Sequence, residues 1–87
     1  MLLDVVAVTA QPPHLLVLEF EDGARRLFDM TAWLDERPFR PLKNSPLFLQ
    51  ARVENGTVVW PGDIDIAPET LYDLSVPIPA ETAPANA

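Results

Sequence analysis

The sequence has 87 residues, of which 48% are hydrophobic and 22% charged, as is typical of one small globular domain. It contains no cysteine, which excludes disulfide bonds and thiolate metal sites, and its apolar runs are too short to cross a bilayer. A net charge of −7 argues against unassisted binding to nucleic acid, where neutralisation of phosphate dominates affinity. Because no basic, apolar leader is visible, we expect a cytoplasmic location and no membrane association.

Two strands are predicted at the start of the chain. Residues 3–10 are rich in valine, which favours extended structure, and the Gln-Pro-Pro sequence at 11–13 ends this strand. Residues 15–20 form the second strand. An Asp-Gly pair at positions 22 and 23 then predicts a hairpin with a two-residue turn.

A two-residue turn fixes the expected register of this hairpin. It pairs Leu18 with Leu27 and brings Glu19 opposite Arg26 as an exposed ion pair, worth only about 0.2–1 kcal/mol. One face of the hairpin is then expected in the core: Leu16, Leu18, Phe20 and Leu27.

Two short helices are predicted in the middle of the chain. Asp29 is placed to cap a helix over residues 30–34, with Trp33 and Leu34 turned inward. Prolines at positions 38 and 41 then interrupt regular structure. Ser45 followed by a proline predicts the second helix, because serine caps helices and proline favours the first helical position.

An Asn-Gly pair at positions 55 and 56 marks a second hairpin. It pairs Val53 with Val58 and Ala51 with Trp60, and these four residues fall on one face that extends the core.

The last predicted helix begins at Pro68 and carries Glu69 in its first turn, where a carboxylate interacts favourably with the helix dipole. From Val76 onward, proline and alanine without periodicity predict a disordered tail. We therefore predict one α+β domain over residues 1–75, followed by a disordered tail over 76–87. The domain should contain a small antiparallel sheet built from hairpins, with two or three short helices.

Several segments carry a family resemblance: Leu-Glu-Phe-Glu-Asp-Gly at 18–23, Phe-Asp-Met at 28–30, Pro-Leu at 41–42, Leu-Phe at 47–48 and the stretch 59–72. Their order and spacing over roughly positions 3–75 resemble the bacterial domain-of-unknown-function family 2442. The most specific part of the resemblance lies in six residues: Trp60, Asp65, Pro68, Glu69, Leu71 and Tyr72.

The resemblance implies a small α+β domain of unsettled biochemistry. Members are often encoded beside another short protein, an arrangement similar to a toxin–antitoxin pair. Some are joined to a helix-turn-helix, and the proline-rich residues after 75 lead us to expect a stand-alone form here. Where the family usually has Asn-Gly-Ala after the tryptophan, this chain has Pro61, Gly62, Asp63 and Ile64, so no role of that loop is carried over.

Few groups suited to catalysis are present. His14 is the single histidine, and as a general base it would need a nucleophile and an orienting acid. Ser45 is assigned to a helix cap, Ser75 lies in no nucleophile motif, and each of the three glycines is expected in a turn rather than in a phosphate loop. We therefore expect neither enzyme activity nor a cofactor.

Asp63, Asp65 and Glu69 are the acidic residues closest to a metal site, since carboxylate oxygens are the ligands of Mg²⁺ and Ca²⁺. The segment lacks the other ligands of a calcium loop. We expect these acids to solvate the loop and to favour the start of the last helix, so no metal is predicted.

All six basic residues fall between positions 25 and 52, a window with a charge of +3, whereas the rest of the chain carries −10. Arg37, Arg40 and Lys43 recur at every third position around Phe39. In an extended polyproline-like conformation these cations line one side beside an exposed Phe39, which suits a partner with acidic groups. The alternative, which we favour, is a surface loop in which Phe39 and Leu42 pack under the core while the cations stay in water.

The function expected from these features is a small non-catalytic protein-interaction module. One form of it is the neutralising half of a toxin–antitoxin-like pair, with a small protein partner encoded by an adjacent gene and contacted through Arg37, Phe39, Arg40 and Lys43. The alternatives are a weak nucleic-acid-binding accessory protein and, less favoured, a metal-dependent hydrolase. A homodimer formed by pairing of strand edges or of opposite charges is compatible with each of them.

Overall fold

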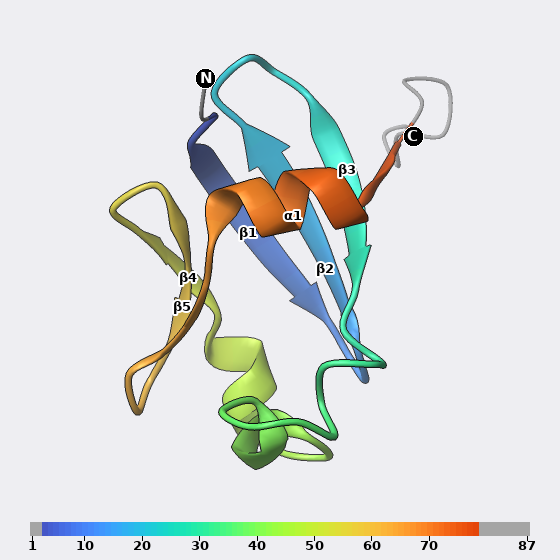
Figure 1. Ribbon diagram of the computed structural model, residues 1–87, viewed down its shortest axis with the longest axis vertical. Helices are drawn as coiled ribbons and strands as arrows, with labels where there is room; N and C mark the ends of the chain where they lie inside the picture. The colour runs from blue at the N-terminus through green and yellow to red at the C-terminus, as the bar shows by residue number, and fades with distance from the viewer. Residues whose placement is uncertain (1–2, 79–87) are drawn as a thin grey trace.

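Two antiparallel sheets, one α-helix and two 3-10 helices make up the computed structural model, which describes residues 3–78 (Figure 1). The predicted α+β class is confirmed, although the helix expected after Ser45 is a 3-10 helix, the one expected over residues 30–34 is not formed, and the strands form two sheets rather than one. The larger sheet has the strand order β1-β2-β3-β7 and the smaller one β4-β5-β6. The elements in chain order are β1 Val5–Gln11, β2 Leu15–Phe20, β3 Arg25–Asp29, η1 Arg40–Leu42, η2 Pro46–Gln50, β4 Arg52–Glu54, β5 Thr57–Trp60, β6 Ile64–Ile66, α1 Pro68–Leu74 and β7 Val76–Pro77.

The turn between β2 and β3 is one residue longer than predicted. Phe20 N donates to Ala24 O at 2.9 Å, which closes a three-residue loop over positions 21–23. Gly23 ends this loop with φ of 87°, a left-handed conformation that glycine adopts without steric cost. This is a common hairpin geometry in which only the glycine needs a positive φ.

The longer turn shifts the register of the hairpin by one residue. Leu18 lies opposite Arg26 and not opposite Leu27. The predicted ion pair between Glu19 and Arg26 is wrong, because Glu19 lies opposite the preceding arginine. A shift of one residue exchanges the two faces of a strand, so Leu27 turns away from the core and Phe28, 1% exposed, takes its place.

The second hairpin has the predicted register, with Val53 opposite Val58. Asn55 and Gly56 both have positive φ, 51° and 79°, as a tight two-residue turn requires. β6, which follows this hairpin, was expected to be a loop. Its three residues alternate buried, exposed and buried, and it adds the third strand of the smaller sheet.

The predicted helix starts at Ser45 and Pro68 are confirmed. Ser45 Oγ accepts a hydrogen bond from Leu47 N at 3.1 Å and caps η2, which is a 3-10 helix. Pro68 is the first residue of α1. α1 has seven residues, and no helix within residues 3–78 is long and apolar enough to cross a membrane.

The ordered domain extends beyond the predicted boundary at residue 75. Val76 and Pro77 form β7, which pairs with β3, and Ile78 N donates to Arg25 O at 2.9 Å. A proline is tolerated here because β7 is an edge strand. Residues 79–87 of the predicted tail lie outside the described residues.

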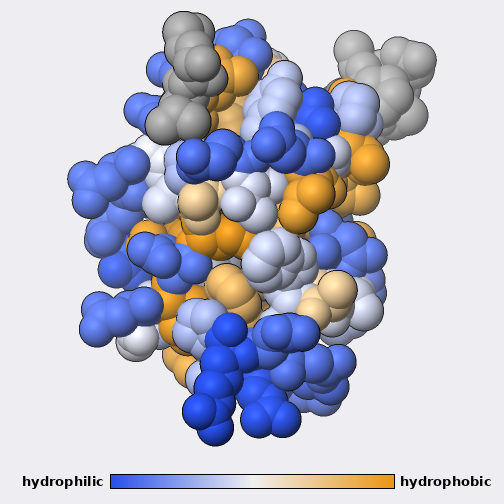
Figure 2. All heavy atoms as spheres, in the orientation of Figure 1, coloured by the Kyte–Doolittle hydropathy of each residue, from blue (hydrophilic) through white to orange (hydrophobic). Residues whose placement is uncertain are grey.

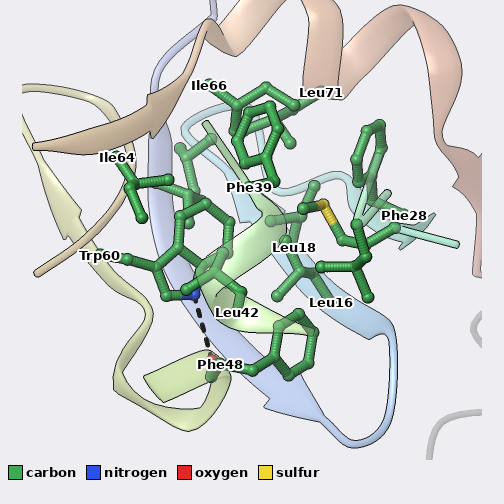
Figure 3. Close-up of a cluster of buried hydrophobic side chains, with 14 of the residues drawn as sticks. Leu16, Leu18, Phe28, Phe39, Leu42, Phe48, Trp60, Ile64, Ile66 and Leu71 are labelled. Carbon is green, nitrogen blue, oxygen red and sulfur yellow. Dashed lines mark hydrogen bonds between the residues drawn. The ribbon is translucent and has the colours of Figure 1, made fainter. Parts of the chain in front are cut away.

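The core lies between the larger sheet, α1 and the smaller sheet (Figures 1 and 3). Trp60 is its largest side chain and is 1% exposed. Its Nε1 donates to Phe48 O at 3.1 Å, the bond drawn dashed in Figure 3, so the single polar atom of the indole is satisfied inside the core. Val5 N donates to Gly56 O at 2.8 Å and links the start of β1 to the second hairpin.

Candidate partner-binding surface

The basic residues singled out in the sequence lie in a turn segment, residues 30–44, that connects β3 to η2. The helix predicted over residues 30–34 is not formed. Asp29 Oδ1 accepts hydrogen bonds from both the N and the Oγ1 of Thr31, at 2.8 and 2.6 Å, and this local turn competes with helical bonding. Leu34 N still bonds to Met30 O at 3.0 Å, but the chain then continues as successive turns into η1.

Phe39 is not an exposed anchor for a partner, and this part of the predicted binding set is corrected. The side chain is 5% exposed, and its ring lies edge-on to both Trp33 and Trp60, with centroids 5.7 and 6.2 Å away. Leu42 is also buried. The surface loop that we favoured from the sequence is confirmed, whereas the extended conformation is wrong because bonds such as Leu42 N to Phe39 O, 2.9 Å, fold the segment into turns.

The three cations of the turn segment are exposed. Lys43 donates to Asp35 Oδ1, and this hydrogen bond, together with the lysine charge, lowers the pKa of Asp35. The charge of Arg40 lowers the same pKa to a smaller extent. Within residues 3–78, Arg37 and Arg40 have no carboxylate oxygen within 4.0 Å. Figure 2 shows strongly hydrophilic side chains gathered at the lower end of the molecule, where Figure 1 draws this segment in green.

A surface hollow of about 270 Å³ lies on this segment, and Arg37 is among the residues that line it. Trp33, predicted to turn inward, is only half-buried, because the expected helix is absent and the indole packs against Phe28 and Phe39 from one side. Sequence reasoning therefore missed Trp33 as a surface residue. The hollow, called here the Trp33 hollow, is lined by Ala32, Trp33, Glu36, Arg37 and Phe39.

His14 contributes to a second hollow, of about 240 Å³, on the same segment. Its Nδ1 lies 3.1 Å from Asp29 Oδ1 but outside hydrogen-bonding geometry. The pKa of Asp29 is lowered mainly by the hydrogen bonds from Thr31 and to a smaller extent by His14. Because the Thr31 hydroxyl donates to Asp29 and not to His14, the imidazole does not activate it as a nucleophile.

The structure does not gather the acidic residues considered as metal ligands. Asp65 lies on the exposed side of β6, Asp63 occupies the preceding turn with φ of 61°, and Glu69 lies in the first turn of α1. In the part of the chain that the structure describes, no three His, Cys, Asp or Glu side chains are close enough to hold a metal ion.

Tyr72 joins α1 to the larger sheet. Its ring lies edge-on to Phe20, with centroids 5.0 Å apart, and the Cζ of Arg26 lies 4.3 Å from the centre of the ring. Arg26 also donates from Nε to Ser75 Oγ at 2.6 Å and from Nη2 to Ser75 O at 2.8 Å. Arg26 therefore binds the C-terminal end of α1, where a cation is favoured by the helix dipole.

The remaining residues of the family resemblance divide into buried and exposed groups. Trp60 and Leu71 are in the core, and Pro68 is the first residue of α1. Asp65 and Glu69 are exposed. Trp60, Leu71 and Tyr72 therefore pack in or against the core, whereas the two acidic residues of the motif face the solvent.

A family model described as "Protein of unknown function (DUF2442)" matches residues 5–77, from the first residue of β1 to the last residue of β7. No curated protein and no solved structure matches the sequence.

Proposed function

The chain belongs to the DUF2442 family of proteins of unknown function, and we propose that it is a non-catalytic module that binds a small acidic protein partner in the cytoplasm. The observation that carries this proposal is the Trp33 hollow, which is lined in part by Arg37, an arginine with no carboxylate oxygen within 4.0 Å in the described chain. Tryptophan and arginine are the residues that most often dominate binding energy at protein interfaces.

The size of the hollow supports a protein partner over a small molecule. At about 270 Å³ and open to solvent, it is below the range of about 300–1,000 Å³ common for ligand pockets. It has room for one apolar side chain of a partner against Trp33. Carboxylates that flank this side chain would then meet Arg37, and Arg40, exposed on the same turn segment, offers a second planar guanidinium group suited to such contacts.

The chemistry around His14 supports a non-catalytic role. The hydroxyl of Thr31, which lines the same hollow as His14, donates to Asp29 and is therefore not paired with the imidazole as a nucleophile with its base. The family resemblance supports a partner encoded by an adjacent gene, and neutralisation of that partner is the form of this function that we propose.

The test is calorimetric titration of the purified chain with the product of the adjacent gene. We expect Arg37→Ala and Arg40→Ala each to weaken binding by about 5-fold to 30-fold, as loss of an interface anchor does, and raised salt to weaken binding further. Arg52→Ala is the matched control, because this exposed arginine lies on β4 and already pairs with Glu54. It should leave the affinity within about twofold of the native value.

Three results would contradict the proposal. One is no binding at about 100 µM of either protein, and another is equal loss of affinity in the control and in the two arginine variants. The third is binding of DNA or RNA with a steep dependence on salt, which would favour the accessory nucleic-acid role instead.

A further inference from the structure

The larger sheet has an outer face that the rest of the described chain leaves uncovered. Figure 1 shows α1 in front of this sheet and no helix behind it. Leu16 and Leu18, both fully buried, point to the covered side, so Val17 between them on β2 points away from it. The register places Val17 opposite Thr9 on β1 and opposite Leu27 on β3.

A row of mainly aliphatic side chains crosses this outer face. Val76 of β7 lies opposite Leu27, so the row runs through all four strands as Thr9, Val17, Leu27 and Val76. The outermost member, Val76, is 57% exposed. A sheet face turned to water is normally polar, and an aliphatic row on it is typical of a surface that binds another protein.

Charged residues beside the row indicate which protein fits. Glu19 on β2 lies directly opposite Arg25 on β3, and within residues 3–78 neither forms an ion pair with N···O within 4.0 Å. If a second copy is related to the first by a twofold rotation about an axis parallel to the strands, its β3 packs over the first copy's β2. Val17 then faces the second copy's Leu27, and Glu19 faces the second copy's Arg25, so the face is complementary to itself.

We propose that the outer face binds a second copy of this chain and forms a symmetric homodimer of two stacked sheets. Glu19 and Arg25 cancel in charge, and Asp29, which lies opposite Leu15 on the same side of the sheet, adds one negative charge, so this face is closer to neutral than the whole chain at −7. This interface uses residues other than those of the proposed partner-binding surface and does not depend on it.

The size of the face sets the expected strength of the dimer. Strands about 4.8 Å apart and about five residues long give a four-stranded face of roughly 300 Å². A stable interface covers about 800 Å² on each partner, so we expect a reversible dimer with a Kd between roughly 10 µM and 1 mM.

Sedimentation velocity between about 10 µM and 1 mM measures this equilibrium. We expect the mean mass to rise with concentration for the native chain and to remain monomeric for Leu27→Lys, which places a cation in the aliphatic row. Arg52→Ala, altered on the smaller sheet, should associate as the native chain does. A native chain that is monomeric at about 1 mM, or a Leu27→Lys variant that dimerises normally, would overturn the proposal.

A pair of charge reversals tests the proposed orientation directly. Glu19→Lys and Arg25→Glu should each associate about tenfold more weakly than the native chain, because like charges then face each other across the interface. An equimolar mixture of the two should dimerise again, since the introduced lysine faces the introduced glutamate and Arg25 of the first variant faces Glu19 of the second. Each variant keeps its unfavourable pair inside its own sheet, so recovery in the mixture arises only between chains. Absence of recovery would overturn the inferred pairing.

Discussion

Replacing Arg26 with methionine removes the guanidinium that joins β3 to the end of α1, while it keeps an unbranched side chain at that position. The native guanidinium donates to Ser75 Oγ and to Ser75 O, at 2.6 and 2.8 Å, and its Cζ lies 4.3 Å from the centre of the Tyr72 ring. Ser75 is 6% exposed. In the variant its carbonyl therefore loses a donor at a position that water reaches poorly.

The expected loss of stability follows from these contacts. A hydrogen bond from a charged donor contributes about 1.5–3 kcal/mol, and a cation–π contact at a partly exposed site about 0.5–1 kcal/mol. The contacts share one half-buried side chain and are not additive, so we expect Arg26→Met to lower the free energy of unfolding by about 2–3 kcal/mol. For a domain of this size that corresponds to a fall in Tm of roughly 10–20 °C.

Urea denaturation followed by circular dichroism, at about 1 µM so that the chain is mainly monomeric, measures the effect. Arg25→Met is the matched control, because Arg25 lies on the outer face of β3 and its loss should cost less than about 0.5 kcal/mol. The two-residue turn expected from the sequence reverses these roles, since it turns Arg26 outward and Arg25 inward. An equal loss in both variants, or a larger loss in Arg25→Met, would refute the observed register and the role of Arg26.

Two further predictions test the core and the start of the turn segment. Trp60→Phe removes the donor to Phe48 O and leaves unfilled volume, so urea denaturation should show a fall of about 2–4 kcal/mol in the free energy of unfolding. The control Trp33→Phe should lower this free energy by less than about 1 kcal/mol, and similar losses in the two variants would contradict the burial of Trp60. Because hydrogen bonds from Thr31 lower the pKa of Asp29 in the folded state, the stability that Asp29 contributes is present above the ordinary value of 3.8 and is lost as pH falls through the lower folded value. Thermal melts between about pH 2 and pH 6 should therefore show a shallower acid loss for Asp29→Asn than for the native chain, and an unchanged slope would contradict this linkage.

The two hairpins show what local sequence could and could not predict. A two-residue turn of the predicted type needs positive φ at both central residues. Asn55 and Gly56 meet this requirement, and the register of that hairpin was predicted correctly. At positions 22 and 23 only Gly23 adopts a positive φ, so the turn takes a third residue. The same Asp-Gly pair is compatible with a two-residue and with a three-residue turn. Which turn forms depends on which face of β3 the core and α1 can cover.

The candidate site was predicted in its charges and in the favoured burial of Phe39, but not in the position of Trp33. The sequence predicted that Arg37 and Arg40 stay in water, and both are exposed. Within the described chain neither has a carboxylate oxygen within 4.0 Å. The partner against which Phe39 packs, Trp60, is distant in sequence, and Trp33 stays half-buried because the expected helix does not form. Spacing along the chain encodes neither of these two features.

The larger sheet is assembled from distant parts of the chain, and this has a consequence for synthesis on the ribosome. β7 borders β3, and Leu71 of α1 covers the inner face of the sheet, yet about 40 residues separate the end of β3 from Leu71. At about 5–20 residues per second, translation of this interval takes roughly 2–8 s. Throughout that time α1 does not cover Leu16 and Leu18, so the core face of the first hairpin is incompletely packed. The domain completes its core only after α1 has been translated.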